Sequence, residues 1–380
     1  MNIALFYHSL VSDWNHGNAH FLRGIAWELQ KRGHMLRIFE PTGGWSLTNL
    51  LHEHGEAPLE AFGELYPGLR STFYEPATLD LDEALELIDL VIVHEWNDPA
   101  LVRRIGAHRR AQGDYRLLFH DTHHRSMTEP EKMAAYDLAG YDGVLVFGKA
   151  IAEIYRSRNW AQRVWVWHEA ADARVFMPLP EVQKEGDLVW IGNWGDDERS
   201  AELQEFLLDP VKALGLKAQV YGVRYPAEAI RALSEAGIEY RGWLPNFQAA
   251  GTLARFRMTV HIPRRPYVKA LPGVPTIRPF EALACGIPLV CAPWEDSERL
   301  FSPGKDYLLA RDGAEMKRQL HRLLSDSQLA GALSAHGRET ILQRHTCAHR
   351  VDELLDIYHH RIDSPITSGK TAHRPREKLL

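Results

Sequence analysis

Short runs of apolar residues alternate with longer amphipathic stretches along most of the chain. In the first half, apolar runs predict strands at residues 2–7, 35–40, 90–94, 116–120, 143–147 and 164–167. Amphipathic stretches such as 21–32 and 149–158 predict helices between these strands. Because strands that alternate with helices usually form a parallel sheet covered on both faces, we expect an α/β fold with a doubly wound sheet.

The alternation starts again in the second half. Strands are predicted at 188–192, 217–221, 238–241, 258–262 and 287–291, and helices at 200–208, 227–236, 279–285 and 314–324. Between the two series, residues 177–186 contain two prolines and several charges without periodicity, as a linker does. We therefore expect two Rossmann-like, doubly wound domains that face a central cleft. The predicted boundaries are 1–178 for the first domain, 179–187 for the linker, 188–346 for the second domain, 347–362 for a helix that packs back toward the first domain, and 363–380 for a disordered tail.

Composition narrows the class of protein. The chain has 380 residues, 45% apolar and 25% charged, which suits a globular protein of about two domains. Its net charge of −6 argues against a surface that neutralises nucleic-acid phosphates, so we expect no nucleic-acid partner. The three cysteines form no C-x-x-C pair, which indicates a reducing compartment, and we expect a cytoplasmic protein. The 11 tryptophans could stack on sugars or bases, although core packing accounts for most tryptophans.

One segment is strongly basic. Residues 240–280 contain no Asp or Glu and carry a charge of +7, which leaves −13 for the rest of the chain. Such segregation points to a bound anion, and a solvated basic face is the alternative.

A short helix is predicted at the end of this basic segment. Pro279 suits its first turn and Gly286 its end, which places Arg278 at the N-cap. Because arginine cannot accept hydrogen bonds from the first backbone N–H groups, these donors are left open for a phosphate. Glu281 could be a plain first-turn acid that the helix dipole favours.

Four motifs, in order along the chain, carry a family resemblance. Residues 280–290, FEALACGIPLV, resemble the C-terminal signature of GT-B-fold glycosyltransferases of the family-four type, especially the CgeB-like group. Residues 17–34 are similar to the family's glycine loop and following helix, 167–178 to the segment that closes its first domain, and 188–192 to the opening strand of its second domain. The resemblance covers nearly the whole chain.

The resemblance implies a nucleoside-diphosphate sugar as donor, of the UDP, GDP or dTDP type, with no metal and no other cofactor. Glu281 would hold the ribose hydroxyls and Arg199 would bind the diphosphate. Arg199, the basic residues from Arg264 to Lys269 and the helix start at Pro279 would replace a metal cation. The other donor-site residues that the resemblance implies are Gly17, Gly192, Asn193, Arg278, Pro279, Phe280 and Ala282, with Gly242, Trp243 and Leu244 as the loop that contacts the base.

At one position the sequence departs from the family pattern, and this position bears on the stereochemistry of sugar transfer. The family usually has a second glutamate eight positions before the ribose one, and Gly273 stands there. We expect a glycosyltransferase that retains the anomeric configuration and uses an unknown acceptor: a glycan, a lipid, a protein or a small molecule. The alternatives are a nucleotide-sugar 2-epimerase and a catalytically silent subunit that binds the sugar nucleotide.

The first domain supplies candidate catalytic residues at two strand ends. In residues 119–125, FHDTHHR, the resemblance places His120 against the donor sugar, and Asp121 could orient it or accept a proton. Glu95, after the strand at 90–94, is a candidate general base, with a satisfied loop carboxylate as the alternative. The H-x-x-H-H spacing leaves metal binding open as a competing idea. A cluster of arginines at 103, 104, 109 and 110 could make weak contact with an anionic membrane, or form a solvated helix face.

Overall fold

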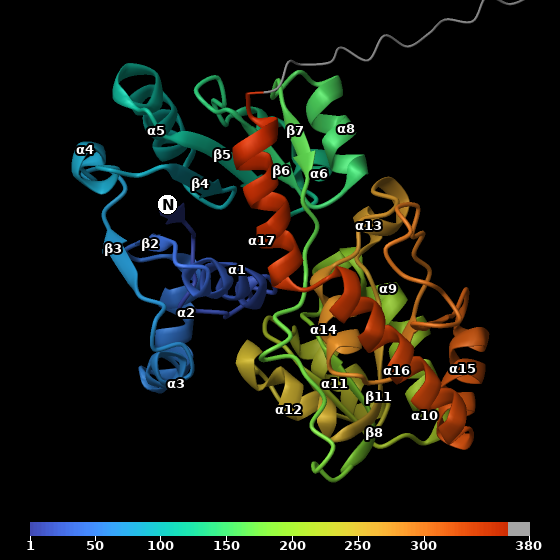
Figure 1. Cartoon of the computed structure of the whole chain (residues 1–380). Helices are drawn as coiled ribbons and strands as arrows, with labels where there is room; N and C mark the ends of the chain where they lie inside the picture. The colour runs from blue at the N-terminus through green and yellow to red at the C-terminus, as the bar shows by residue number, and fades with distance from the viewer. Residues whose placement is uncertain (364–380) are drawn as a thin grey trace, which may run out of the picture.

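The computed structural model describes residues 1–363, in which the strands form two separate parallel sheets (Figure 1). Of the tail expected at 363–380, residues 364–380 lie outside the described residues. The first sheet comprises β1 (Asn2–Phe6), β2 (Met35–Pro41), β3 (Ser71–Tyr74), β4 (Leu90–His94), β5 (Arg116–Asp121), β6 (Gly143–Val146) and β7 (Val164–Val166). The second comprises β8 (Gly186–Ile191), β9 (Ala218–Tyr221), β10 (Ile238–Tyr240), β11 (Phe256–His261), β12 (Leu289–Cys291) and β13 (Leu308–Leu309).

Both sheets have the same topology. Their strand orders are β3-β2-β1-β4-β5-β6-β7 and β10-β9-β8-β11-β12-β13, so each winds outward in both directions from its first strand. In the register of the first sheet, Ile3 pairs with Leu36 on one side and with Leu90 on the other. Each sheet therefore has a switch point beside its first strand, where doubly wound folds bind ligands. The expected pair of doubly wound sheets is confirmed.

Helices cover both faces of the first sheet (Figure 1). They are α1 (Ala19–Lys31), α2 (Trp45–His54), α3 (Ala57–Leu65), α4 (Leu81–Ala84), α5 (Pro99–Gln112), α6 (Arg125–Thr128), α7 (Pro130–Ala134) and α8 (Lys149–Ser157). Successive residues of β1 face opposite sides: Ile3 and Leu5 pack with the apolar face of α1, whereas Ala4 and Phe6 pack in the core beneath α5 and α8. Burial on both faces explains why these strands are almost uninterrupted apolar runs.

The second sheet has its own helices, and the last ones extend beyond it. They are α9 (Ser200–Leu203), α10 (Asp209–Leu214), α11 (Ala227–Glu235), α12 (Ala249–Ala254), α13 (Arg265–Ala270), α14 (Ile277–Ala284), α15 (Gly313–Ser325), α16 (Ser327–Arg344) and α17 (Cys347–Asp356), with 3₁₀ turns at Asp196–Glu198 and Asn246–Gln248 and π-helical turns at Gln204–Leu208 and Ile357–Arg361. Helix α17 lies against α1, where Arg32 bonds to Asp352 at 2.5 Å and to the carbonyl of Ala348 at 3.0 Å. The predicted domain boundaries themselves stay a prediction.

Several elements differ from the sequence expectations. Strands β3 and β13 and helix α16 were not predicted. The expected helix at 200–208 is only α-helical to Leu203 and continues as a π-helical turn. Helix α14 starts at Ile277, so its N-cap is Thr276 and the prediction of Arg278 at the N-cap is wrong. Pro279 still falls in the first turn, where its missing N–H is harmless.

Direct contacts join the two domains. Asn15 in the loop after β1 bonds to Asn193 after β8, and the Asp13 carboxylate accepts the backbone N–H of Asn246 at 3.0 Å. Asp13 also accepts Arg23 Nη1 at 2.9 Å, and this fully buried guanidinium donates to the carbonyls of the same loop. The loop between β1 and α1 is thus fixed from both domains.

Candidate active site

A cleft of about 560 Å³ lies between the two domains, at the carboxyl ends of both sheets. The first domain contributes residues that follow β1, β4 and β5, and the second contributes residues that follow β8 and β11 together with the start of α14. The cleft therefore opens at the switch points of both sheets. Its volume is within the range of sites that take a small organic ligand.

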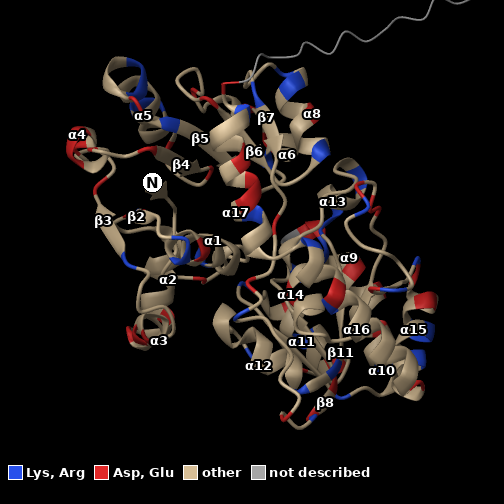
Figure 2. Ribbon diagram, viewed as in Figure 1, with Lys and Arg blue, Asp and Glu red and all other residues tan. Residues whose placement is uncertain are grey.

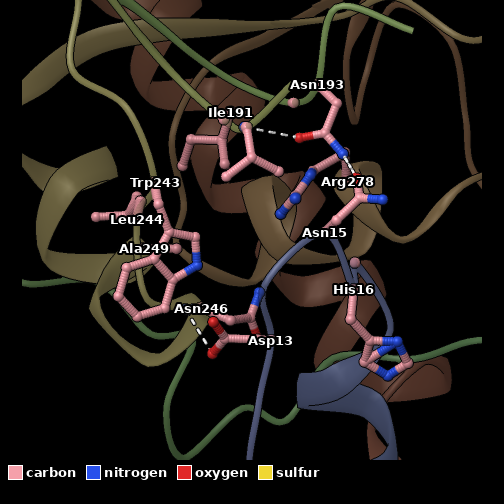
Figure 3. A pocket seen from close by; sticks show the side chains of 14 residues that line it. Asp13, Asn15, His16, Ile191, Asn193, Trp243, Leu244, Asn246, Ala249 and Arg278 are labelled. Atoms are coloured by element: carbon pink, nitrogen blue, oxygen red, sulfur yellow. Dashed lines mark hydrogen bonds between the residues drawn. The ribbon is translucent and has the colours of Figure 1, made fainter. Parts of the chain in front are cut away.

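A smaller pocket of about 90 Å³ continues from the cleft. Arg278, Asn15 and Asn193 lie at one side of it, and Trp243 and Leu244 lie at the other (Figure 3). The two spaces share the lining residues Asn15, His16, Gly17, Ile191, Gly192, Asn193 and Arg278. Together they form one elongated cavity with a narrow end.

The second-domain wall of the cleft is cationic. Arg199, Arg264 and Arg278 all line it. The Arg199 guanidinium donates to the carbonyls of Asn193 and, at 3.1 Å, Ile262, and lies 5.0 Å from the Trp190 ring. Burial and the charge of Arg264 lower the pKa of Arg199. The guanidinium groups of Arg199 and Arg264 therefore repel each other. An anion that enters the cleft would reduce this repulsion, because its negative charge would offset the two positive charges.

Two helix N-termini, one from each domain, border the cleft. Thr276 and Ile277 at the start of α14 line the cleft, as does Asn18 at the N-cap of α1. The Thr276 hydroxyl bonds to His261 Nε2 at 3.0 Å and, within residues 1–363, makes no side-chain cap to the helix. The first backbone N–H donors of α14 thus remain uncapped. The reason is that the Thr276 hydroxyl bonds to His261, and not that an arginine stands at the N-cap. A helix start of this kind favours phosphate oxygens.

Glu281 is buried behind Arg278 rather than on the cleft surface. One carboxylate oxygen lies 2.8 Å from His20 Nδ1 and accepts Asn246 Nδ2 at 3.1 Å, and the other bonds to Arg278. Burial alone would raise the pKa of Glu281, but the charge of Arg278 and the contact with His20 outweigh it and lower the pKa. The carboxylate is therefore ionised and fixes Arg278 at the cleft. A ribose contact would require Arg278 or Asn246 to give way.

Most other cations of the basic segment are neutralised away from the cleft. Basic and acidic residues lie beside one another around α13 and at the far end of the second sheet (Figure 2). The pairs are Arg241 with Glu239, Arg255 with Glu185, Arg257 with Asp187, and Arg265 with Glu202. Lys269 is exposed and lines a separate shallow pocket with Asp197 and Glu198, so its expected place in the diphosphate site is wrong.

The remaining donor-site candidates are divided between the cavity and the core. Gly17, Gly192 and Asn193 line both parts of the cavity, and Trp243 and Leu244 line its narrow end. Gly242 supports that loop by accepting the N–H of Gly222 at 2.8 Å. Pro279, Phe280 and Ala282 are buried inside α14, where the Phe280 ring lies 5.2 Å from Phe301, so their side chains do not reach the cleft.

His120 and Asp121 lie behind the cleft, not on it. His120 is 1% exposed and packs edge-on to Trp167 at 4.9 Å and to His94 at 5.3 Å. The Asp121 carboxylate accepts the Tyr155 hydroxyl at 2.8 Å and the N–H of His123 at 3.0 Å. Burial and the neighbouring Glu95 raise the pKa of Asp121. The structure therefore contradicts the expectation that either side chain faces the donor sugar.

Glu95 is also engaged inside the first domain. It is fully buried and accepts Arg125 Nη2 at 2.7 Å and the N–H of Thr122 at 2.8 Å. Glu95 therefore fits the alternative given in the sequence analysis, a loop carboxylate whose hydrogen bonds are satisfied, better than it fits a general base. Its role is to hold the loop after β5 in place.

Among the first-domain residues that line the cleft, the sequence predicted only Gly17. Those that it missed include His8, His16, Trp45, Trp96, His123 and Glu169. His123 belongs to the same FHDTHHR motif as His120, three positions later, where the chain has left β5. Glu169 is 3% exposed, and its Oε2 has no hydrogen-bond partner among residues 1–363. Burial and the charge of Glu281 raise the pKa of Glu169 well above its usual range.

The backbone conformation and the close neighbours of residue 273 explain why this position is a glycine. Its φ of +81° is one that favours glycine, and an added Cβ would lie 2.4 Å from Ser297 Oγ and 2.7 Å from Glu298 Cγ. A glutamate cannot occupy this position with the present backbone. Glu298 itself joins the domains, since it bonds to His168 Nε2 at 2.9 Å and to the backbone N–H of Lys149 at 2.6 Å.

Two further expectations concern a metal ion and an anionic membrane. No group of three or more His, Cys, Asp or Glu side chains there is arranged to hold a metal ion, and no helix there is long and apolar enough to cross a membrane. In the arginine cluster on α5, Arg104 donates to the carbonyls of Pro76 and Leu79, and Arg109 donates to the carbonyl of Tyr115. These two side chains are thus occupied within the first domain.

Comparison with known proteins supports the fold and the class of enzyme. Residues 199–356 match the family described as glycosyl transferase-like, whereas no curated protein matches the chain. Among solved structures, a sucrose-phosphate synthase from Thermosynechococcus elongatus is similar with a TM-score of 0.63 at 15% identity, over 94% of this chain and 98% of that chain. An alpha-glucosyltransferase in complex with UDP and a 13-mer DNA has a TM-score of 0.65 at 13% identity, over 94% and 99% of the two chains. The T4 phage enzyme BGT in complex with its UDP-glucose substrate has a TM-score of 0.59 at 13% identity, over 96% and 100%.

The chain thus has the GT-B fold, with two parallel-sheet Rossmann-like domains, and its second half carries a glycosyltransferase-like domain. It is an enzyme of the glycosyltransferase class.

Proposed function

We propose that this GT-B enzyme transfers a sugar from a nucleoside-diphosphate sugar, most simply a UDP-sugar, to a hydroxyl-bearing acceptor. The observation that carries the proposal is the convergence of Arg199, Arg264 and Arg278 with the uncapped start of α14 at one wall of the cleft. UDP or UDP-glucose is bound in two of the similar structures, which supports a donor of the same class. The narrow end at Trp243 and Leu244 would take the base.

The cationic wall suits the bond that must break. As the bond from the anomeric carbon to the diphosphate oxygen breaks, its electron pair stays on that oxygen, and negative charge grows on the departing nucleoside diphosphate. The acceptor oxygen forms the new bond to the anomeric carbon and gives up its proton. Fixed guanidinium groups and backbone N–H donors stabilise the leaving group during this step. We therefore propose that the transfer needs no metal ion.

We also propose that the configuration at the anomeric carbon is retained. In that course the departing diphosphate oxygen, held by the second-domain wall, accepts the acceptor proton on the same face of the sugar. The family resemblance supports this course. The CgeB-like subgroup and a cytoplasmic location belong to the same proposal.

The first test is nucleotide binding. Thermal unfolding is measured with UDP, GDP, dTDP and their sugars, since a ligand that binds only the folded state raises Tm. Arg199→Ala should weaken binding of the preferred nucleotide roughly 100-fold, because hydrogen bonds to a charged group contribute about 1.5–3 kcal/mol each. Lys269→Ala is the matched control, since it removes a basic side chain of the same segment outside the cleft.

The second test follows the chemistry by NMR. The enzyme and the preferred donor are incubated with EDTA, and both the sugar configuration and release of nucleoside diphosphate are recorded. Release of the diphosphate with a retained anomer supports the proposal. A C2 epimer without acceptor would identify an epimerase, binding without any release would identify a silent subunit, and activity that requires added magnesium would refute metal independence.

A further inference from the structure

The acceptor is the part of the reaction that the donor site does not identify, and the first-domain wall holds evidence of its chemistry. Among the described residues, the side chains that line this wall include no lysine and no arginine. Every arginine of the cleft belongs to the second domain. The two walls therefore differ sharply in charge.

The histidines of the first-domain wall add no positive charge. Burial lowers the pKa of His8 to about 3 and the pKa of His16 and His123 well below the usual range, so all three are neutral at physiological pH. Within residues 1–363, His8 Nδ1, His16 Nε2 and His123 Nδ1 have no hydrogen-bond partner. Each can donate or accept one hydrogen bond, depending on its tautomer. These buried nitrogens are polar atoms whose hydrogen-bonding capacity the described part of the protein does not satisfy.

Two first-domain tryptophans line the same cleft as these imidazoles. Trp45, at the start of α2, is 55% exposed, and Trp96, after β4, is 44% exposed, although both line the cleft. The His8 ring lies 6.2 Å from Trp96 and 4.0 Å from His16, and the His123 ring lies 5.4 Å from Trp96, so Trp96 and these imidazoles form one patch. Glu169 is the one carboxylate among the described residues of this wall, and its Oε2 is unpaired.

A sugar ring matches this combination. It has apolar C–H faces that pack on aromatic rings and hydroxyl groups at its edge that both donate and accept hydrogen bonds. A nucleic acid or a phospholipid carries phosphates, which proteins bind with lysine, arginine or helix N-termini. The arginine beside this wall, Arg125, stacks on Trp96 but is already paired with Glu95, and Asn18 at the start of α1 bonds to Glu169. Phosphates would therefore meet occupied groups and a carboxylate on this wall.

We propose that the first-domain wall is the acceptor subsite and that it takes an uncharged, hydroxyl-bearing ring, namely a sugar residue of a neutral glycoside. Its face packs on Trp45 or Trp96, and its hydroxyls bond to His8, His16, His123 and Glu169. This assignment rests on the proposed glycosyl transfer. It separates the chain from the similar alpha-glucosyltransferase whose structure contains DNA.

The experiment uses the full chain and the donor identified by nucleotide binding. Release of nucleoside diphosphate is measured with water alone, with neutral p-nitrophenyl glycosides and maltose, with a DNA duplex that carries a hydroxymethylated base, and with phosphatidylinositol vesicles. We expect a neutral glycoside to raise the release rate at least tenfold above hydrolysis, with the glycosylated product seen by mass spectrometry. DNA and vesicles should leave the rate at the hydrolytic level.

Three variants test the residues. Trp45→Ala and Trp96→Phe should each raise KM for the glycoside roughly tenfold, the effect of about 1.4 kcal/mol of lost contact, with KM for the donor within twofold of wild type. Phe73→Ala is the matched control, because Phe73 is 44% exposed in the same domain and does not line the cleft. Thermal unfolding of each variant separates lost binding from lost folding.

The outcomes distinguish this assignment from the proposed function. Preferential modification of DNA or lipid, or a donor that is hydrolysed while every neutral glycoside is inert, would overturn the acceptor assignment and leave glycosyl transfer standing. A change in donor KM alone in the tryptophan variants would also overturn it. Absence of both donor binding and hydrolysis would refute the proposed function, and the acceptor assignment with it.

Discussion

The two walls of the cleft each hold a buried glutamate, and the two carboxylates behave in opposite ways. Glu281, on the second-domain side, is 2% exposed and paired with Arg278 and His20, which lower its pKa. Glu169, on the first-domain side, is 3% exposed with an unpaired Oε2, and burial raises its pKa. Burial is nearly equal, so the partners decide which carboxylate is ionised.

This difference extends to the walls themselves. The second-domain wall is a set of fixed charges that are already paired or held by carbonyls, which suits an anionic leaving group. The first-domain wall is a set of neutral polar atoms and aromatic surfaces, several of them unpaired in the described part of the chain. Separation of charge between the domains lets one cleft bind two chemically different substrates.

Removing the main cation should produce the largest effect. Arg278→Ala deletes a cleft guanidinium and leaves the buried Glu281 carboxylate without its strongest partner. We expect donor affinity to fall at least 100-fold and the free energy of unfolding to fall by about 3 kcal/mol, the scale for breaking a buried ion pair. Calorimetry with UDP and urea denaturation measure the two losses. Arg257→Ala, a surface pair in the same segment, should change neither.

Glu281→Gln tests the second-domain carboxylate more gently. Because folding lowers the pKa of Glu281, its stabilisation is present above the ordinary carboxyl pKa and is lost as pH falls through the lowered value. The variant should be less stable than wild type by roughly 1.5–3 kcal/mol at pH 7. The gap should narrow as the pH approaches 3 in urea denaturation. A gap that does not vary with pH would contradict the assigned ionisation.

The third prediction compares two histidines of one motif. His123 lines the cleft, whereas His120 lies behind it. His123→Ala should lower kcat/KM for transfer about tenfold with little change in Tm. His120→Ala should lower Tm, because it leaves a cavity between His94 and Trp167, while activity per folded molecule stays within about threefold. The reverse pattern would restore His120 as the residue that contacts substrate.

The smallest effect concerns Glu169 and has the opposite sign to that of Glu281. Folding raises the pKa of Glu169, so the folded state resists its ionisation, and this group lowers stability as pH rises above the ordinary carboxyl pKa. Glu169→Gln should therefore raise Tm by a few degrees at pH 8 and have little effect at pH 4. Thermal unfolding across this range measures the difference. A variant that is less stable at pH 8 would show that the carboxylate has an ionic partner.

Elements that are buried along their whole length could be predicted well from the sequence. Strands such as β1 and β4 are apolar runs because both faces of a parallel sheet are covered, whereas β3 has exposed central residues and β13 has only two residues. Helix α16 was missed because its buried positions are few and spread along its length: Leu333, Gly337, Thr340 and Ile341.

In the site, charge segregation identified Arg278 because a net basic window is visible in the sequence itself, whereas Arg199, which lies outside that window, was identified by the family resemblance. Lys269 was placed wrongly because its separation from the cleft depends on how α13 packs against Asp197 and Glu198. The neutral wall could not be predicted, since His8, Trp96 and His123 come from three loops that meet only through the order of β1, β4 and β5.

Helix α17, at the end of the chain, packs against α1 of the first domain. This contact determines which fragments of the chain can fold on their own. The family match at residues 199–356 starts after β8, a central strand of the second sheet, and ends with α17, whose partner α1 lies outside the match. That segment is therefore not an autonomous folding unit. A chain divided in the linker would give one fragment with an uncovered α1 and another that carries α17. Because each exposes an apolar face that fits the other, the two should reassemble when produced together, and fragment complementation would depend on this helix pair together with the contacts of Asp13, Asn15 and Glu298 between the domains.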